Sequence, residues 1–323
     1  MAFLPRKGDE KMKLAFVFPG QGSQSVGMMD GWAGNEAAEQ VIAEAGRSLK
    51  EDLSELMHKG PTEILNLTVN TQPVMLASSL AMYRAYRAAG GRAPEVMAGH
   101  SLGEYTALTA AGVFSLFDAV RLVRFRAEAM QSAVPVGVGS MAAIIGGKEE
   151  VLAEACAQAA QGEVVEMVNF NAPGQIVIAG HRNAVDRACQ LAVAKGARRA
   201  VKLPVSAPFH SSLLIDAARS IAVRLAQTEV KVPEIPVIAN VDVMAHDTPE
   251  SIRDSLARQA SRPVQWVKTI EKMRDMGVTH IVECGPGKVL TGLIRRIAPE
   301  MQTMSISSQA SLDSILATES FRE

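Results

Sequence analysis

The chain is poor in cysteine and almost balanced in charge. Its three cysteines, Cys156, Cys189 and Cys284, are far apart and odd in number. They therefore predict reduced thiols rather than a disulfide scaffold, a metal cluster or a redox pair. A net charge of −1 gives no global electrostatic reason to expect nucleic acid or an anionic membrane as a partner. No apolar run reaches the ~18 residues that a membrane-spanning helix needs.

The N-terminal segment lacks the pattern of a secretory signal. Residues 1–13 are polar and contain no apolar core, and Met12 is an alternative natural start to Met1. Together with the reduced thiols, this segment predicts a cytoplasmic protein. A length of 323 residues accommodates one large domain and a smaller one.

Short apolar strands alternate with helices along most of the chain, which predicts an α/β fold with a mostly parallel sheet covered on both faces. The expected strands of this sheet are 14–18, 96–98, 236–240 and 279–283. Residues 137–204 instead follow the order β-α-β-β-α-β of a ferredoxin-like unit. We therefore expect a large α/β-hydrolase-like domain, residues 1–136 and 205–323, interrupted by a small ferredoxin-like subdomain, residues 137–204. The polar end from Ser307 is expected to be loosely held.

A Gly-His-Ser-Leu-Gly motif at 99–103 carries the clearest chemical signal. It lies between an apolar strand and a helical pattern that begins at Glu104, which is the context of a nucleophile elbow. Such a turn lifts the serine hydroxyl to the carboxyl edge of a sheet, beside the backbone N–H groups of the next helix. Ser101 is therefore the expected nucleophile of an acyltransferase or a hydrolase.

A serine needs a base, and His210 is the best placed of six histidines. It follows a predicted strand end and precedes a helix, and it comes after Ser101 in chain order, as in α/β-hydrolase-like sites. His100 is too close to Ser101 along the chain, so we expect a packing role for it. No acid has a signature for the third member of a triad. We expect a carbonyl to hold the imidazole tautomer, with an acid from Asp242, Asp247 or Glu283 as the alternative.

Two backbone N–H groups are expected to bind the oxyanion of the tetrahedral intermediate. One belongs to Leu102, directly after the nucleophile. The other is expected from the Pro-Gly-Gln-Gly turn at 19–22, where glycines on both sides of Gln21 let the backbone approach a substrate. A dinucleotide-binding loop is excluded because Ser25 stands where that motif requires a third glycine.

One arginine can be selected by its helical phase. On a helix from 116 to 131, Arg126 shares a face with Ala119, Leu122 and Met130. A guanidinium on an apolar face needs an anionic partner, and its planar fork suits a carboxylate. From phase alone, a substrate carboxylate and a structural ion pair remain equal interpretations.

The motifs together resemble those of the malonyl-CoA:acyl carrier protein transacylases. The resemblance extends from Lys13 to Ile297. Its segments are Phe-Pro-Gly-Gln-Gly-Ser-Gln at 18–24, Gly-His-Ser-Leu-Gly-Glu-Tyr at 99–105, Arg-Phe-Arg at 124–126, Asn-Phe-Asn at 169–171, Phe-His at 209–210, Asn-Val-Asp at 240–242, Pro-Val-Gln-Trp at 263–266 and Glu-Cys-Gly-Pro-Gly at 283–287.

This resemblance implies a role for each candidate residue. Ser101 would be the nucleophile, His210 the base, and Arg126 the group that holds the malonyl carboxylate. Backbone N–H groups would form the oxyanion hole, and a main-chain carbonyl would orient the base; the residues implied are Gln21 and Leu102 for the first role and Gln265 for the second. The implied reaction is ping-pong transfer from malonyl-CoA to the phosphopantetheine thiol of acyl carrier protein, in fatty acid biosynthesis, with no metal or redox cofactor.

The resemblance also implies an acidic carrier protein as the partner, so a basic docking patch is expected. The candidates are Arg198, Arg199, Lys202, Arg295 and Arg296. The enzyme is expected to be a monomer. Two alternative functions use the same nucleophile and base: a malonyl-loading subunit of a malonate decarboxylase, and a serine thioesterase or hydrolase.

Overall fold

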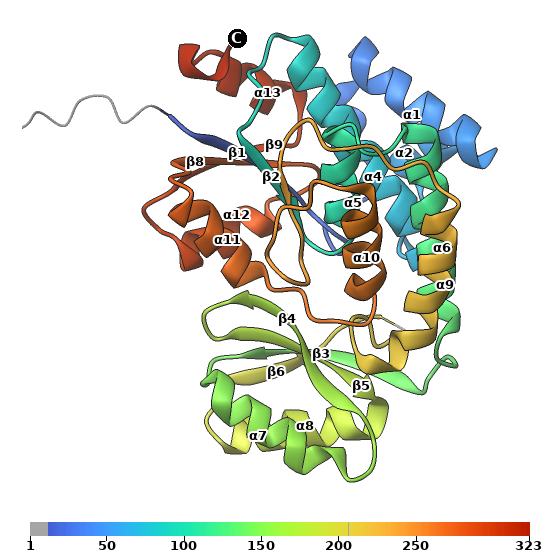
Figure 1. Ribbon diagram of the computed structural model, residues 1–323, viewed down its shortest axis with the longest axis vertical. Helices are drawn as coiled ribbons and strands as arrows, with labels where there is room; N and C mark the ends of the chain where they lie inside the picture. Colours follow the sequence, from blue (N-terminus) through green and yellow to red (C-terminus); the bar gives the residue numbers. More distant parts are fainter. Residues whose placement is uncertain (1–11, 206) are drawn as a thin grey trace, which may run out of the picture.

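The computed structural model describes residues 12–205 and 207–323 (Figure 1). Two parts of the predictions lie outside the described residues. One is Met1 with the beginning of the predicted range 1–136, and the other is Ser206 in the segment before His210. No helix of the described part is long and apolar enough to cross a membrane.

A parallel five-stranded sheet forms the centre of the larger part, which confirms the predicted α/β class. The strand order is β7-β2-β1-β8-β9. The strands are β1 (Leu14–Phe18), β2 (Val96–Gly99), β7 (Val237–Ile238), β8 (His280–Cys284) and β9 (Gln302–Ile306). Side chains of β1 alternate between the two faces. Phe16 packs into one apolar core and Val17 into the other, because successive residues of a strand point to opposite sides.

Helices cover both faces of this sheet (Figure 1). The smaller core, which contains Val17, is covered by α11 (Trp266–Asp275) and α12 (Val289–Ile297). The larger core, which contains Phe16, is covered by α1 (Glu36–Leu49), α2 (Leu53–Lys59), α3 (Thr62–Leu65), α4 (Thr68–Ala88), α5 (Leu102–Ala110), α6 (Leu116–Ser132), α9 (Ile215–Ala226), α10 (Pro249–Gln259) and α13 (Gln309–Leu316).

A second, antiparallel sheet lies below the first in Figure 1, and its order β-α-β-β-α-β is the predicted one. The strands run in the order β4-β5-β3-β6. The elements are β3 (Gly139–Ile145), α7 (Glu149–Ala160), β4 (Val165–Ala172), β5 (Gln175–His181), α8 (Arg182–Ala194) and β6 (Arg199–Lys202). Helices α7 and α8 cover one face. The other face presents Met141 and Val177 towards Phe209 of the larger part. The domain limits at 136/137 and 204/205 stay a prediction.

The C-terminal end is the part of the fold that the sequence prediction misjudged. The segment from Ser307 is not loosely held, because α13 and the strand β9 before it pack against the larger part. Leu312, Ile315 and Leu316 lie three and four residues apart, so one face of this short helix is apolar and buried. Ser308 caps its first turn by accepting from the N–H of Ser311.

Two glycines allow β2, α5 and the end of β1 to meet within van der Waals contact. A Cβ at Gly99 would lie 1.8 Å from the carbonyl carbon of Gly103, and a Cβ at Gly103 would lie 2.0 Å from the carbonyl oxygen of Phe18. Both distances are too short for any side chain. The turn that presents Ser101 therefore requires glycine at both positions for reasons of space.

We expect Gly103→Ala to destabilise the fold, because the new methyl group can be accommodated only by moving α5 away from β1. The expected loss is about 1–3 kcal/mol in the free energy of unfolding, measured by urea denaturation. Gly292→Ala is the matched control, since Gly292 is exposed within α12 and a Cβ there meets nothing within 4 Å. That variant should keep or slightly raise the stability. Equal midpoints for both variants would contradict the packing explanation.

Candidate active site

Ser101 lies between β2 and α5 in a conformation that few side chains adopt. Its φ is 53° and its ψ is −109°. Asn240 holds this turn from the loop after β7. The Ser101 N–H donates to Asn240 Oδ1 at 2.7 Å, and Asn240 Nδ2 donates to the Gly99 carbonyl at 2.7 Å. These two hydrogen bonds offset the strain of the elbow.

His210 approaches the Ser101 hydroxyl from a separate loop, and 97% of its surface is buried. Its Nε2 is 2.7 Å from Ser101 Oγ, and its Nδ1 is 2.8 Å from the main-chain carbonyl of Gln259. A carbonyl only accepts, so the proton of the neutral ring is on Nδ1 and Nε2 is free to accept the serine proton. Burial and the neighbouring Arg126 charge lower the pKa of His210 to about 3.

The expectation that the Gln265 carbonyl orients His210 is wrong. That carbonyl accepts from the N–H and the hydroxyl of Thr269, inside the first turn of α11. Gln259 is instead the last residue of α10, where the carbonyls have no partner within the helix. The sequence did carry this signal, because the helical pattern at 249–259 ends at Gln259 and Pro263 follows closely.

None of the three candidate acids contacts His210. Asp242 pairs with Arg258 and His246, and the Glu283 carboxylate accepts from backbone N–H groups at the start of α12. Asp247 is exposed. The hydrogen-bond partner of His210 Nδ1 is therefore a carbonyl, as the sequence analysis expected, although it comes from a different residue.

Arg126 is buried on the inner face of α6 and donates only to neutral groups. One terminal nitrogen donates to Gln72 Oε1 at 2.7 Å, and the other to Gln259 Oε1 at 2.9 Å and Ser101 Oγ at 3.1 Å. Its Nε has no hydrogen-bond partner in the described part of the chain, and the guanidinium carbon lies 5.2 Å from the centre of the Tyr105 ring. No carboxylate of the described residues forms an ion pair with it. The interpretation of Arg126 as half of a structural ion pair is therefore not supported. The other interpretation, that Arg126 binds an anionic substrate, remains.

Glu104, one turn into α5, connects the two segments that hold Ser101 and His210. Its Oε2 accepts from Gln259 Nε2 at 2.7 Å and from the Asn240 N–H at 3.0 Å. Burial raises the pKa of Glu104 to about 7, although these hydrogen bonds and the Arg126 charge oppose the shift. Gln259 Nε2 also donates to the Ser101 carbonyl at 3.0 Å. Gln259 therefore contacts His210, Arg126, Ser101 and Glu104.

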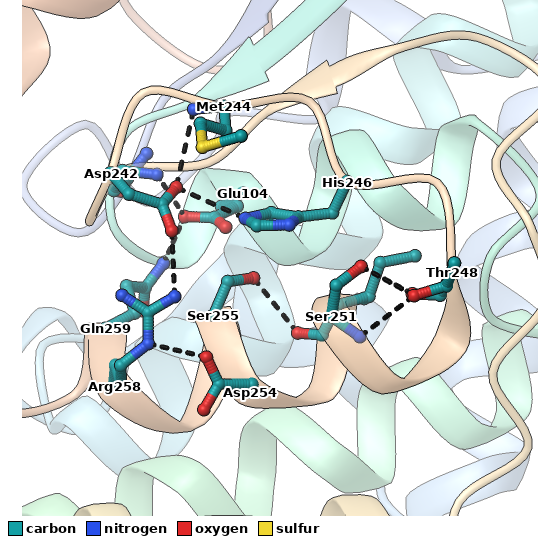
Figure 2. A network of polar contacts seen from close by, with 12 residues as sticks. Glu104, Asp242, Met244, His246, Thr248, Ser251, Asp254, Ser255, Arg258 and Gln259 are labelled. Atoms are coloured by element: carbon teal, nitrogen blue, oxygen red, sulfur yellow. Dashed lines mark hydrogen bonds and ion pairs between the residues drawn. The ribbon is translucent and has the colours of Figure 1, made fainter.

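A second set of contacts braces Gln259 and Asn240 from outside (Figure 2). Arg258 donates to Asp242 Oδ2 at 2.8 Å and to Asp254 Oδ2 at 2.7 Å, which ties the end of α10 to the loop after β7. His246 contacts the other oxygen of Asp242 at 3.2 Å. The loop that carries Asn240 and the helix end that carries Gln259 are therefore fixed relative to each other.

A cavity of about 580 Å³ brings the candidate residues together, with the exception of Gln265. The residues that line it are Gln21, Gln72, His100, Ser101, Leu102, Arg126, Met130, Met141, Asn169, Leu203, Val205, Phe209 and His210. Leu102 begins α5, so its N–H has no acceptor within the helix. The Gln21 N–H makes no hydrogen bond to a described residue, and its side chain accepts from Thr68 at 2.8 Å. Both N–H groups are thus available at the cavity.

The described residues contain no group of three or more His, Cys, Asp or Glu side chains suited to a metal ion. His100 Nε2 donates to Asn171 Oδ1 at 2.7 Å, and the His100 ring packs edge-on against Trp266. It therefore has the packing role that the sequence predicts, at the junction between the elbow and β4.

Comparison with known proteins decides the family. A model described as the acyl transferase domain matches residues 15–312. The chain belongs to this acyl transferase family. A malonyl CoA-acyl carrier protein transacylase from Escherichia coli (strain K12) is 50% identical to it over 305 residues, 94% of this chain and 99% of that protein. The resemblance inferred from the motifs is thereby confirmed.

Solved structures place this acyl transferase among close relatives. An acyl-carrier-protein S-malonyltransferase from Burkholderia pseudomallei 1710b is 52% identical, with a TM-score of 0.93 over 95% of this chain and 100% of that chain. A malonyl-transacylase in complex with a type II PKS acyl-carrier protein is 47% identical, with a TM-score of 0.93 over 94% of this chain and 99% of that chain.

Removing the Arg126 charge should raise the pKa of His210 in this acyl transferase. A protonated imidazole cannot accept the Ser101 proton, so the rate of Ser101 modification should fall at a higher pH in Arg126→Ala than in the wild type, where the pKa of His210 is about 3. Phenylmethanesulfonyl fluoride, a neutral reagent, measures this rate without needing the arginine for binding. Arg121→Ala, on the exposed side of α6, is the control. An unchanged acid limb in Arg126→Ala would contradict the electrostatic assignment.

Proposed function

We propose that this chain transfers malonyl groups from malonyl-CoA to the phosphopantetheine thiol of an acyl carrier protein, through a malonyl ester on Ser101. The observation that carries the proposal is the buried Arg126 guanidinium, whose partners are two neutral amides and the nucleophile itself. A buried cation that forms no ion pair with a carboxylate of the described residues favours an acyl group that brings its own carboxylate. The names of the relatives support the same substrate class.

In the first half-reaction, the Ser101 hydroxyl gives its proton to His210 Nε2 as the oxygen attacks the thioester carbon. The N–H groups of Leu102 and Gln21 donate to the oxyanion, and loss of one such donor typically costs about 3–4 kcal/mol. When the intermediate collapses, the carbon–sulfur bond breaks and the imidazolium returns the proton to the CoA sulfur. The Gln259 carbonyl keeps the ring oriented while it is charged.

The second half-reaction runs through the same groups in reverse. The thiol of the carrier protein loses its proton to His210, and its sulfur attacks the malonyl-serine ester. The proton then returns to Ser101 Oγ as the ester bond breaks. Arg126 holds the malonyl carboxylate throughout, so the acyl carbon stays at the two oxyanion donors while one thiol leaves and the other arrives.

We place the enzyme in the cytoplasm, as a monomer that needs no resident metal or redox group. Three free cysteines suit a reducing compartment. Every proton and electron pair in the two half-reactions comes from the chain, from the malonyl-CoA thioester or from the thiol of the carrier protein.

Mass spectrometry tests the proposal directly. The protein is mixed with malonyl-CoA, digested and analysed for a malonyl group on the Ser101 peptide, and holo acyl carrier protein is then added to a parallel sample. We expect the adduct to form and to move to the carrier. Ser101→Ala should form none, and Arg126→Ala should lose malonyl loading while it keeps or gains acetyl loading.

The other outcomes separate the alternative functions. An adduct that is released only to water would favour a thioesterase or hydrolase. An adduct that passes to a different carrier would favour the malonate decarboxylase subunit. Unchanged preference for malonyl over acetyl in Arg126→Ala would remove the carboxylate role of that residue.

We propose a docking surface for the acidic carrier protein on the exposed cations that the sequence singles out. Lys202 is balanced by Asp186, 2.7 Å away, and contributes least. The other four form no ion pair with a carboxylate of the described residues, so their charge is available to a partner: Arg198, Arg199, Arg295 and Arg296.

Hydrogen bonds support the continuity of this surface across the two sheets. Arg296, on α12, donates to the main chain of the β4–β5 turn. Gly174 in that turn accepts from the N–H of Gly146, and a Cβ on Gly146 would lie 3.0 Å from the backbone nitrogen of Arg198. Arg296 and the backbone of Arg198 therefore lie near the same turn, although they are about a hundred residues apart in the sequence.

Reversing Arg198, Arg199 and Arg295 to glutamate should raise KM for the holo carrier protein by about tenfold at low salt and flatten its salt dependence. Loading of Ser101 from malonyl-CoA should stay within about twofold of the wild type. A triple reversal of Arg47, Arg84 and Arg121, which are exposed on other helices, controls for net charge. Identical carrier kinetics in the two triple variants would remove the surface assignment.

A further inference from the structure

Strand β4 brings two asparagine side chains to the active-site region, and among the described residues only one of their two amide oxygens has a hydrogen-bond partner. Asn171 Oδ1 is 2.7 Å from His100 Nε2, which fixes it against the nucleophile elbow. Asn169 lines the cavity beside Ser101, is 91% buried, and its Oδ1 has no hydrogen-bond partner among the described residues. A buried amide oxygen without a donor lowers the stability of the fold, so this side chain either only destabilises the protein or forms part of a binding site.

The backbone around Asn169 is braced, so the side chain has a defined direction. The pairing of β4 with β5 shifts its register between Met167 and Asn169 and again between Phe170 and Ala172. Between these shifts the main chain pairs with the other part of the protein. Val264 donates its N–H to the carbonyl of Val168 at 2.8 Å and accepts from the N–H of Phe170 at 3.0 Å. Such irregularities re-aim side chains next to active sites.

We propose that Asn169 binds an amide of the pantetheine arm that CoA and the carrier protein share. This inference rests on the proposed function. The acyl end of the substrate offers only acceptors, namely the malonyl carboxylate and the thioester carbonyl. The first N–H donor is the pantetheine amide two methylene groups beyond the sulfur. Because a side-chain amide has both an acceptor and a donor, it can pair with a secondary amide as one peptide group pairs with another.

The path of the arm agrees with this position. A larger cavity of about 1170 Å³ adjoins the active-site cavity, and the two share Gln21, Val205 and Phe209 as lining residues. An arm that runs from the outer cavity to Ser101 passes the shared wall before its sulfur reaches the nucleophile. Asn169 then marks the inner end of that path, and both half-reactions use it because the arm is common to the two thioesters.

The experiment pairs a change in the protein with a change in the substrate. The malonyl thioester of N-acetylcysteamine keeps the first amide, whereas the malonyl thioester of n-pentanethiol replaces it with methylene groups. Single-turnover malonylation of Ser101 is followed by intact mass for both thioesters. Asn169→Leu replaces the amide with an apolar group of the same branched shape, and Gln158→Ala removes an exposed amide on α7 as the control.

We expect the wild type and Gln158→Ala to prefer the amide thioester by about tenfold. Asn169→Leu should lose this preference, with a slower reaction of the amide thioester and an unchanged reaction of the pentanethiol thioester. Its melting temperature should stay equal or rise, because the wild-type amide oxygen has no partner among the residues that the structure describes. A purely structural asparagine would instead lower the melting temperature and slow both thioesters equally.

The failure of the inference differs from the failure of the proposed function. If wild-type Ser101 is malonylated and Asn169→Leu keeps the tenfold preference, the pantetheine assignment is overturned and the transferase stands. If Asn169→Leu slows both thioesters equally, Asn169 does not recognise the pantetheine amide, and the assignment is also overturned. If wild-type Ser101 is malonylated by neither thioester nor by malonyl-CoA, the proposed function falls and this inference falls with it.

Discussion

The active site depends on the end of one helix. Gln259, the last residue of α10, offers its main-chain carbonyl to His210 and its side-chain oxygen to Arg126, while its side-chain nitrogen donates to Ser101 and Glu104. One residue therefore sets the tautomer of the base, the direction of the guanidinium and the position of the elbow. The buried Glu104 carboxylate fixes which way the amide faces, since the reverse orientation would put an oxygen against an oxygen.

Electrostatics explain why this arrangement uses amides where many serine enzymes use an acid. A carboxylate next to His210 would raise its pKa and would also neutralise Arg126, which lies within reach of the same serine. The neutral carbonyl does not pair with the positive charge of Arg126 at the cavity, and the low pKa of His210 follows from burial together with that charge. His210 is thus a weaker base, and the Arg126 guanidinium stays free to pair with an acyl group.

Local patterns predicted the elements and the residues whose roles depend on them. Alternation in β1, the glycines around Ser101 and the helical phase of Arg126 are properties of short segments, and each led to the position that the structure shows. The partners of these residues depend on tertiary contacts. Gln72 is 54 residues from Arg126, and Gln259, whose carbonyl faces His210, is 49 residues from that histidine. Asn169 was not assigned a role because its direction follows from irregular pairing of β4.

The hydrogen bonds between the two sheets determine how substrates reach Ser101. Val264 pairs with β4 on both sides, and His100 joins Asn171 directly behind the nucleophile. A hinge opening between the parts that carry the two sheets would break these hydrogen bonds and would also distort the nucleophile elbow. We therefore expect a fixed corridor, through which a long, thin arm must pass. Selectivity for such substrates would begin with their shape, before the acyl group reaches Arg126.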